Sequence, residues 1–96
     1  MPTLALLIAA DHPAYAGHFP GRPITPGVVL LDAAQLAIEA ACGQRISGLA
    51  MAKFLSPHTP GEALELDYSL SESAARFEIT AGKRKIASGR FSLATA

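Results

Sequence analysis

The sequence has one cysteine, few charged residues and no net charge. The single Cys42 excludes an internal disulfide and is typical of a protein that works in a reducing compartment. Eight basic residues balance eight acidic ones, so no broad positive field is present to attract nucleic acid. We therefore expect no nucleic-acid partner.

The sequence also lacks an uninterrupted apolar run long enough to span a membrane. The longest run begins at Val28 and is broken by polar residues, namely Asp32, Gln35 and Glu39. Residues 1–10 are mostly apolar, but they contain no basic residue and so do not resemble a secretory signal peptide. These features predict a cytoplasmic protein with no membrane partner.

Apolar residues make up 50% of the 96 residues, which is a large share for a short chain. This length predicts a single domain, residues 1–96. A domain of this size leaves much of its surface exposed, so its core is marginal without a partner. Association of identical chains would bury the excess apolar surface. We expect a homodimer or a larger even oligomer.

A helix is predicted from about Pro26 to Cys42, after an irregular segment rich in Gly and Pro. Thr25 can cap its start and Gly43 can end it. The few polar residues of this helix lie three and four positions apart on one narrow face: Asp32, Gln35 and Glu39. Because the other sides are apolar, we expect protein to surround most of the helix.

One strand is expected before the helix and four after it. Thr3–Ala10 and Arg45–Leu55 are apolar on both faces, which predicts two buried strands, the second of them central in its sheet. Three later segments alternate apolar and polar residues and predict half-buried antiparallel strands: Glu62–Leu70, Ala75–Ala81 and Lys85–Ala94. A tight turn is expected at Gly82 and Lys83. This order predicts an α+β fold, an antiparallel sheet curled around one long central helix.

Two motifs carry a resemblance to a known family. The first comprises Gly17-His18-Phe19-Pro20-Gly21, Pro23, Pro26-Gly27, Asp32-Ala33 and Gln35. The second comprises Ala52-Lys53-Phe54, Pro57 and Pro60-Gly61-Glu62. Together they resemble the signature of the hot-dog-fold 3-hydroxyacyl-acyl-carrier-protein dehydratases of fatty-acid and related polyene or polyketide pathways. The resemblance implies a hot-dog fold, usually a dimer whose sheets join edge to edge.

The resemblance also implies a reaction, the dehydration of a 3-hydroxyacyl thioester to the trans-2-enoyl thioester. The acyl group would be carried by the phosphopantetheine of an acyl carrier protein or by CoA. Dehydration needs a base for the C2 proton, and a neutral imidazole suits that task near pH 7. The resemblance implies this role for His18 and places Phe19 at the substrate site. A loop histidine that hydrogen-bonds only to backbone is the alternative for His18.

The helix start and its polar face supply the other candidate groups. Asp32 lies among apolar residues and needs a partner, and the resemblance implies that it orients or protonates the departing 3-hydroxyl. The family has Glu here in one branch and Asp in another, which also isomerises the double bond. The N–H groups of Gly27 and Val28 can hold the thioester oxygen, with Gly27 freer because Thr25 can cap Val28. Gln35 can hold the Asp32 carboxylate or be a surface residue.

Two other functions stay open: a hot-dog thioesterase, and a non-catalytic acyl-binding or partner subunit. The second draws on two expected departures from the family. Members commonly have two basic residues where this chain has Leu55 and Ser56, and typical members have an additional N-terminal segment before the first strand. His12 and His58 lie beside prolines, and their spacing to His18 fits no metal signature. We expect neither a metal nor a cofactor.

Overall fold

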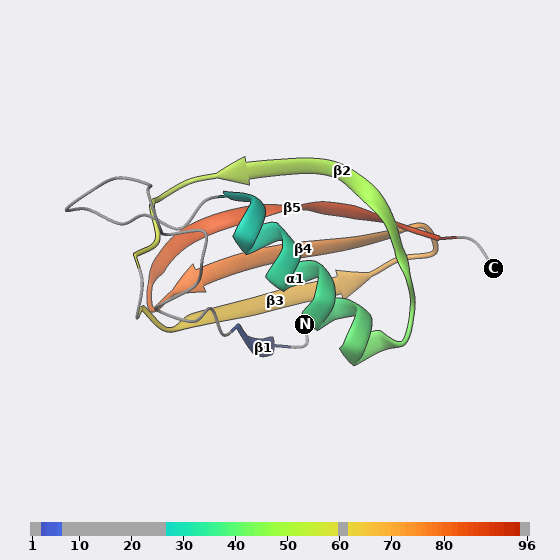
Figure 1. The fold of residues 1–96 in the computed structure, drawn as a ribbon, viewed down its shortest axis with the longest axis horizontal. Helices are drawn as coiled ribbons and strands as arrows, with labels where there is room; N and C mark the ends of the chain where they lie inside the picture. The colour runs from blue at the N-terminus through green and yellow to red at the C-terminus, as the bar shows by residue number, and fades with distance from the viewer. Residues whose placement is uncertain (1–2, 7–26, 60–61, 95–96) are drawn as a thin grey trace.

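One helix and five strands lie in the parts of the chain that the structure describes. The computed structural model describes residues 3–6, 27–59 and 62–94. The elements in chain order are β1 (Thr3–Leu6), α1 (Gly27–Cys42), β2 (Ile46–Phe54), β3 (Leu64–Leu70), β4 (Ala74–Ala81) and β5 (Arg84–Leu93). The helix lies across one face of the sheet (Figure 1). The predicted α+β architecture is therefore confirmed.

The five described strands form one antiparallel sheet in the order β1-β3-β4-β5-β2. Strands β3, β4 and β5 follow one another as a meander, and β1 and β2 occupy the two edges. The turn from β4 to β5 passes through Gly82, whose φ of 63° is strained for residues with a side chain. The tight turn predicted at Gly82 and Lys83 is thus confirmed.

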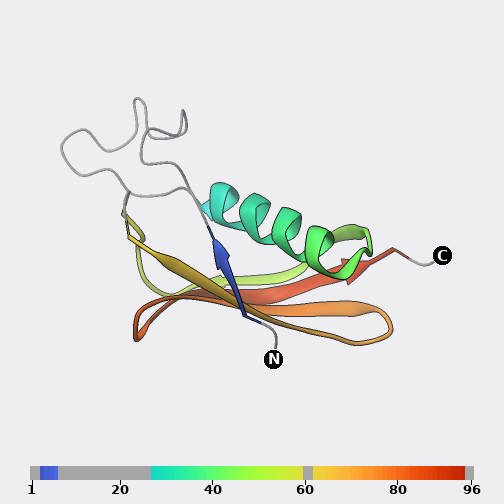
Figure 2. The same cartoon turned by 90° about the horizontal axis from the view of Figure 1, so that it is seen from below.

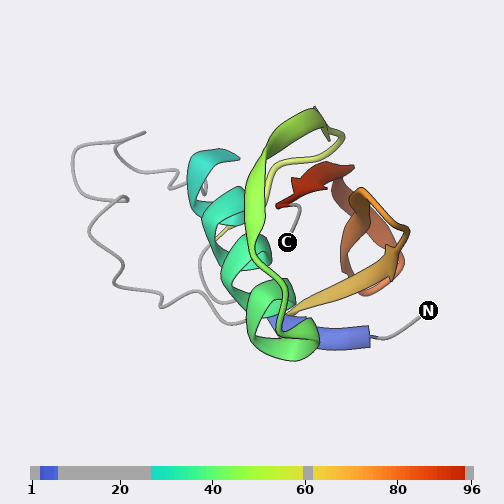
Figure 3. The same ribbon diagram turned by 90° about the vertical axis from the view of Figure 1, so that its right-hand side faces the viewer.

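The core lies between α1 and the concave face of the sheet. Leu30, Ala34 and Ile38 recur every four residues on the helix and are all buried. The sheet contributes alternate side chains, and the rings of Phe77 and Phe91 stack with centroids 4.7 Å apart. The sheet curls partly around the helix (Figure 3). The half-buried pattern predicted for the last two strands is confirmed in β4 and β5.

The end of α1 is fixed by its C-terminal residues. Gly43 has a φ of 73°, and its N–H donates to the carbonyl oxygen of Glu39 at 3.0 Å. The Glu39 carboxylate accepts a hydrogen bond from the backbone N–H of Ile46 at 2.8 Å. The side chain of a helix residue therefore positions the first residue of β2.

The helix is buried on one side only within this chain, so the expectation that protein surrounds most of it is wrong for the single chain. Val28 and Leu36 are 63% and 66% exposed, and Leu31 is partly buried against the core. The sheet covers one side of α1 and leaves the other uncovered (Figure 2). An apolar helix face predicts that something covers it, but the pattern does not say whether the same chain or another one does.

The burial expected for the second strand is wrong among the described residues, and that expected for the first is not met over Thr3–Leu6; residues 7–10 of its predicted range lie outside the described residues. Strand β1 pairs only with β3, and Leu6 is its one buried residue. Strand β2 is an edge strand rather than a central one, and it exposes Leu49, Met51 and Phe54. A strand with apolar residues on both faces is normally covered by other segments. No described residue covers β2 in this way, so the sequence pattern overestimated its burial.

Candidate active site

The first turn of α1 meets the end of β2. Gly27 opens the helix, and its backbone N–H and those of the next residues have no partner within the helix. The ring of Phe54 lies against Gly27, so that a Cβ added there would be 2.6 Å from Phe54 Cζ. Only glycine permits this approach of the ring to the positive end of the helix dipole.

A cavity of about 340 Å³ opens at this junction. Its described lining residues come from the helix start and from the segment that follows β2: Gly27, Leu30, Phe54, Leu55, Ser56, Pro57 and His58. Most of these side chains are apolar. The cavity therefore combines an apolar wall with the backbone of the helix N-terminus, which suits an acyl chain that ends in a polar carbonyl.

His58 forms part of the cavity wall and is only 2% exposed. Its Nε2 lies 3.0 Å from the carbonyl oxygen of Glu62. Because a carbonyl oxygen can only accept, Nε2 carries the hydrogen and donates. The sequence indicated a histidine beside a proline with no metal-binding spacing, and it did not predict that His58 lies at the cavity. The sequence signal that could have indicated this place is the position of His58 inside the second motif.

The Glu62 carboxylate holds the segment that carries His58. It accepts hydrogen bonds from the N–H and the hydroxyl of Thr59, both at 3.0 Å. Arg84 reaches both carboxylate oxygens from β5, at 2.9 and 2.8 Å, and also donates to the Pro57 carbonyl at 3.1 Å. The Thr59 N–H and the Arg84 guanidinium lower the pKa of Glu62 to about 2. The cavity wall is therefore tied to β5 by a charged group.

Asp32 is exposed on α1 and does not line this cavity. It lies one turn from Val28 and one turn from Leu36, on the uncovered side of the helix. Gln35 is half-buried, and no hydrogen bond joins its side chain to Asp32 in the structure. No described residue forms a hydrogen bond or an ion pair with the Asp32 carboxylate, so the partner that the sequence argument requires is not found among the described residues.

The proposed base and its neighbour cannot be placed. His18 and Phe19 lie outside the described residues, as do Thr25 and the residues of the predicted loop. Their roles remain predictions. Among residues 3–6, 27–59 and 62–94, no three metal-ligating side chains come together, and no helix is long and apolar enough to cross a membrane.

Comparison with protein families gives a decisive match. A family model described as ApeI-like, ApeI dehydratase, matches residues 2–90. The chain belongs to the ApeI-like dehydratase family. The resemblance to hot-dog dehydratases seen in the two motifs is therefore confirmed.

Curated relatives are named 3-hydroxyacyl-[acyl-carrier-protein] dehydratase FabZ. The protein from Herpetosiphon aurantiacus is 33% identical over 78 residues, 72% of this chain and 55% of the relative. The protein from Chloroflexus aggregans is 36% identical over 73 residues, 67% of this chain and 51% of the relative. The chain thus spans about half the length of the curated relatives it matches.

Solved structures share the fold. The dehydratase heterocomplex ApeI:P from Xenorhabdus doucetiae matches with a TM-score of 0.82 and 26% identity, over 97% of this chain and 86% of that one. A variant of the fluoroacetyl-CoA-specific thioesterase FlK matches with a TM-score of 0.73 and 16% identity, over 98% and 87%. The second likeness shows the fold alone, and both confirm the hot-dog architecture.

Proposed function

We propose that this chain dehydrates a 3-hydroxyacyl thioester to the trans-2-enoyl thioester in acyl-chain biosynthesis. The observation that supports this most is the apolar cavity at the start of α1, which brings Gly27 of the first motif together with Phe54 and Pro57 of the second. A thioester carbonyl at the Gly27 N–H would place the acyl chain against Leu30 and Phe54. Membership of the ApeI-like family supports the same reaction.

In the proposed reaction, the His18 imidazole takes the proton from C2 as the electron pair forms the C2–C3 double bond. The C3–O bond breaks, and the protonated Asp32 carboxyl gives its proton to the departing hydroxyl, which leaves as water. The Gly27 N–H donates to the thioester oxygen while enolate charge develops. A donor of this kind contributes about 3–4 kcal/mol in comparable sites.

We infer a homodimer in which each site uses residues of both copies. The unpaired edge of β2 would join the same edge of a second copy. Four exposed apolar residues near this edge and on the uncovered side of α1 would then be buried: Val28, Leu36, Leu49 and Phe54. Asp32 lies within that surface, so it would enter the site of the other copy and gain the partner it lacks here.

We propose an acyl carrier protein as the carrier, because the curated relatives are named for it. Leu55 and Ser56 line the cavity here, so docking of the carrier would rely on other residues than in typical members. CoA is the alternative carrier. A cytoplasmic location agrees with Cys42, which is a free thiol in the structure.

The test is to incubate the protein with crotonyl and 3-hydroxybutyryl thioesters while following enoyl absorbance and free thiol together. Interconversion without thiol release supports the dehydratase. Thiol release would instead indicate a thioesterase, and no reaction at all would indicate a non-catalytic subunit. His18→Ala should lower turnover about 10²–10⁴-fold, the usual contribution of a positioned general base. The sequence predicts that His12→Ala and His58→Ala each change turnover little. His12→Ala is the control for loss of a histidine, because His58 is buried in the cavity wall and its replacement could also disturb the fold.

A further inference from the structure

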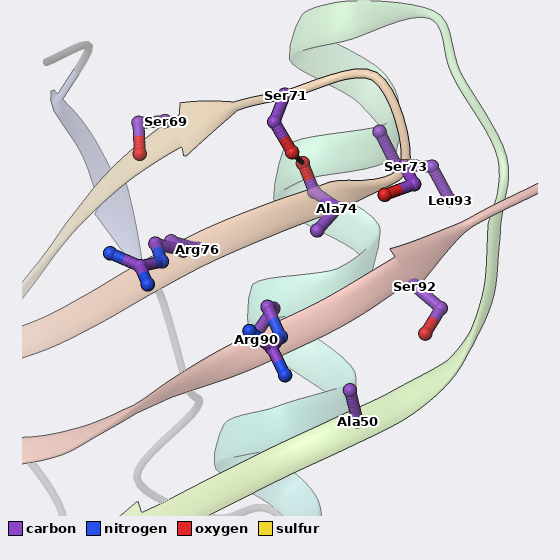
Figure 4. Close-up of a pocket in the computed structure, with 9 residues that line it drawn as sticks. All are labelled: Ala50, Ser69, Ser71, Ser73, Ala74, Arg76, Arg90, Ser92 and Leu93. Carbon is purple, nitrogen blue, oxygen red and sulfur yellow. Dashed lines mark hydrogen bonds between the residues drawn. The ribbon is translucent and has the colours of Figure 1, made fainter.

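The face of the sheet opposite α1 carries a row of polar side chains. Ser69 of β3 is directly opposite Arg76 of β4, and Arg76 is directly opposite Arg90 of β5. Residues directly opposite in an antiparallel pair point to the same face of the sheet. Their inward neighbours Ala75, Phe77, Gly89 and Phe91 are buried, so the arginines point away from the core. Figure 4 shows both guanidinium groups on this outer face.

Arg76 and Arg90 form a like-charge pair that no other described residue neutralises. The Cβ atoms of directly opposite residues lie about 4.5–5.5 Å apart, and like charges there are destabilising. The ion pairs between described residues join Arg84 to Glu62 and Lys85 to Glu78. Neither Arg76 nor Arg90 takes part in one, and both are exposed. Two adjacent unneutralised guanidinium groups are a feature that an anion would stabilise.

The two arginines border a shallow depression of about 760 Å³. Four serines also line it: Ser69, Ser71, Ser73 and Ser92. The Ser71 hydroxyl donates to the Ala74 carbonyl at 3.3 Å, whereas no described residue receives a hydrogen bond from the other three hydroxyls. The depression therefore combines two fixed positive charges with unused hydroxyl donors.

The next row of the outer face holds two acidic residues, and each already has a partner. Glu78 lies 3.8 Å from the Lys85 ammonium group. Asp67, directly opposite Glu78, accepts a hydrogen bond from the Thr3 hydroxyl. Neither is among the residues that line the depression. Glu78 does line a neighbouring depression with Arg76 and Arg90, but its ion pair is with Lys85 and not with either arginine. No described acidic residue therefore neutralises the two arginines.

We propose that this depression is an anion-binding site for a phosphate monoester or free phosphate, with Arg76 and Arg90 as its main ligands. Each guanidinium presents a planar fork of donors, and two forks need more acceptor oxygens than one carboxylate has. A phosphate group offers three or four oxygens and carries a charge of about −1.5 to −2 at pH 7, which matches two arginines. The serine hydroxyls serve the remaining oxygens. The site lies on the other face of the sheet from α1, so it is separate from the candidate active site.

Calorimetric titration of the full chain with inorganic phosphate, at fixed ionic strength, tests the site. Arg76→Gln and Arg90→Gln should each weaken phosphate binding about tenfold or more, since hydrogen bonds to charged groups contribute about 1.5–3 kcal/mol. Arg45→Gln is the matched control, because it removes the same charge from an exposed position before β2, and it should bind phosphate like the wild type. Both test substitutions are at exposed positions, and an unchanged melting curve verifies the fold. Absence of phosphate binding by the wild type, or equal binding by the doubly substituted protein, overturns the proposal.

CoA and dephospho-CoA distinguish the two sources of phosphate, since they differ only in a phosphate monoester. In each titration, the difference between the wild type and the doubly substituted protein isolates binding at this depression. Suppose that CoA binds at the depression more tightly than phosphate does, and that dephospho-CoA loses this additional affinity. The ligand is then a phosphorylated carrier molecule. CoA that binds there no more tightly than phosphate identifies the free ion. Dephospho-CoA that binds there as well as CoA, with both more tightly than phosphate, excludes the phosphate monoester and overturns the proposal.

Discussion

The ring of Phe54 occupies the space that any side chain at position 27 would need. A Cβ on Gly27 would lie 2.6 Å from Cζ and 2.8 Å from Cε1 of that ring. The contact joins the start of α1 to the end of β2, two segments that the sequence separates by a full helix and a strand. It therefore sets the shape of the cavity at their junction.

Replacing Gly27 by alanine should alter the cavity without unfolding the chain. The colliding atoms are the tip of a side chain that is 54% exposed, so the ring can move aside. We expect kcat/KM with a crotonyl thioester to fall up to about 10²-fold, because small displacements of positioned groups are costly. The melting temperature should change little. Adding Phe54→Leu to Gly27→Ala should restore part of the activity, and a double variant no better than the single one would contradict a steric cause.

Gly89 should be far less tolerant than Gly27. A Cβ there would lie 2.3 Å from the backbone oxygen of Met51 and 2.8 Å from Phe77 Cζ, and a backbone atom cannot turn away. Gly89→Ala should lower the free energy of unfolding by about 1–3 kcal/mol or more, measured by urea denaturation. Gly48→Ala, also at the β2–β5 pair, has no atom within 4 Å and serves as the control. Equal decreases in the free energy of unfolding for Gly89→Ala and Gly48→Ala would contradict the close contact between β2 and Gly89.

The Glu62 carboxylate should make the free energy of unfolding depend on pH in the acidic range. Its pKa falls from 4.5 to about 2 on folding, so the unfolded chain binds its proton first as the pH is lowered. The resulting stabilisation is fully present above about pH 4.5 and is lost as the pH falls through about 2. Glu62→Gln should therefore unfold at lower urea concentration than the wild type at pH 7, and the difference should shrink toward pH 2. Glu72→Gln, in the exposed β3–β4 turn, should show no such trend; a constant difference for Glu62→Gln would contradict the assignment.

Mixing two inactive variants tests whether each site spans two copies. His18→Ala and Asp32→Ala should each be nearly inactive. After random exchange of subunits, half of the dimers would be hybrids with one intact site of two, so activity should return to about a quarter of the wild type by counting on a two-fold symmetric dimer.

Exchange must be verified independently, for example by mass spectrometry of differently tagged chains. Verified exchange without recovery would place His18 and Asp32 in the same chain. The shared-site part of the proposed function would then be wrong, whereas the dehydratase activity itself would not be affected.

The local fold could be predicted from the sequence because each signal was local. The change from Gly and Pro to an apolar run located α1, and the alternation of Phe77 and Ile79 with polar residues located β4. A local sequence pattern does not identify the segment or the chain that packs against an apolar surface. The same pattern described buried Leu30 and exposed Leu36, so the burial of the helix and of β2 was overestimated.

The candidate site likewise has one part that the sequence predicted and one part that it did not. The place of Gly27 at the helix start followed from the end of the Gly and Pro run. The contribution of His58, Glu62 and Arg84 to the cavity wall did not, because it depends on a contact between the segment after β2 and the first residue of β5. The register that brings Arg76 opposite Arg90 likewise emerges only when β4 and β5 are paired.

The order of strands in the sheet also bears on how the chain folds. The meander β3–β4–β5 closes through short turns, whereas the Thr3–Asp67 contact of β1 spans 64 residues and the Ser47–Ser92 contact of β2 spans 45. Closing long loops costs chain entropy before any contact compensates for it, so this connectivity favours a nucleus in the meander and late docking of both edges. The cavity between Gly27 and Phe54 exists only once β2 has docked. We therefore expect the part of the molecule that would bind substrate to assemble last during folding.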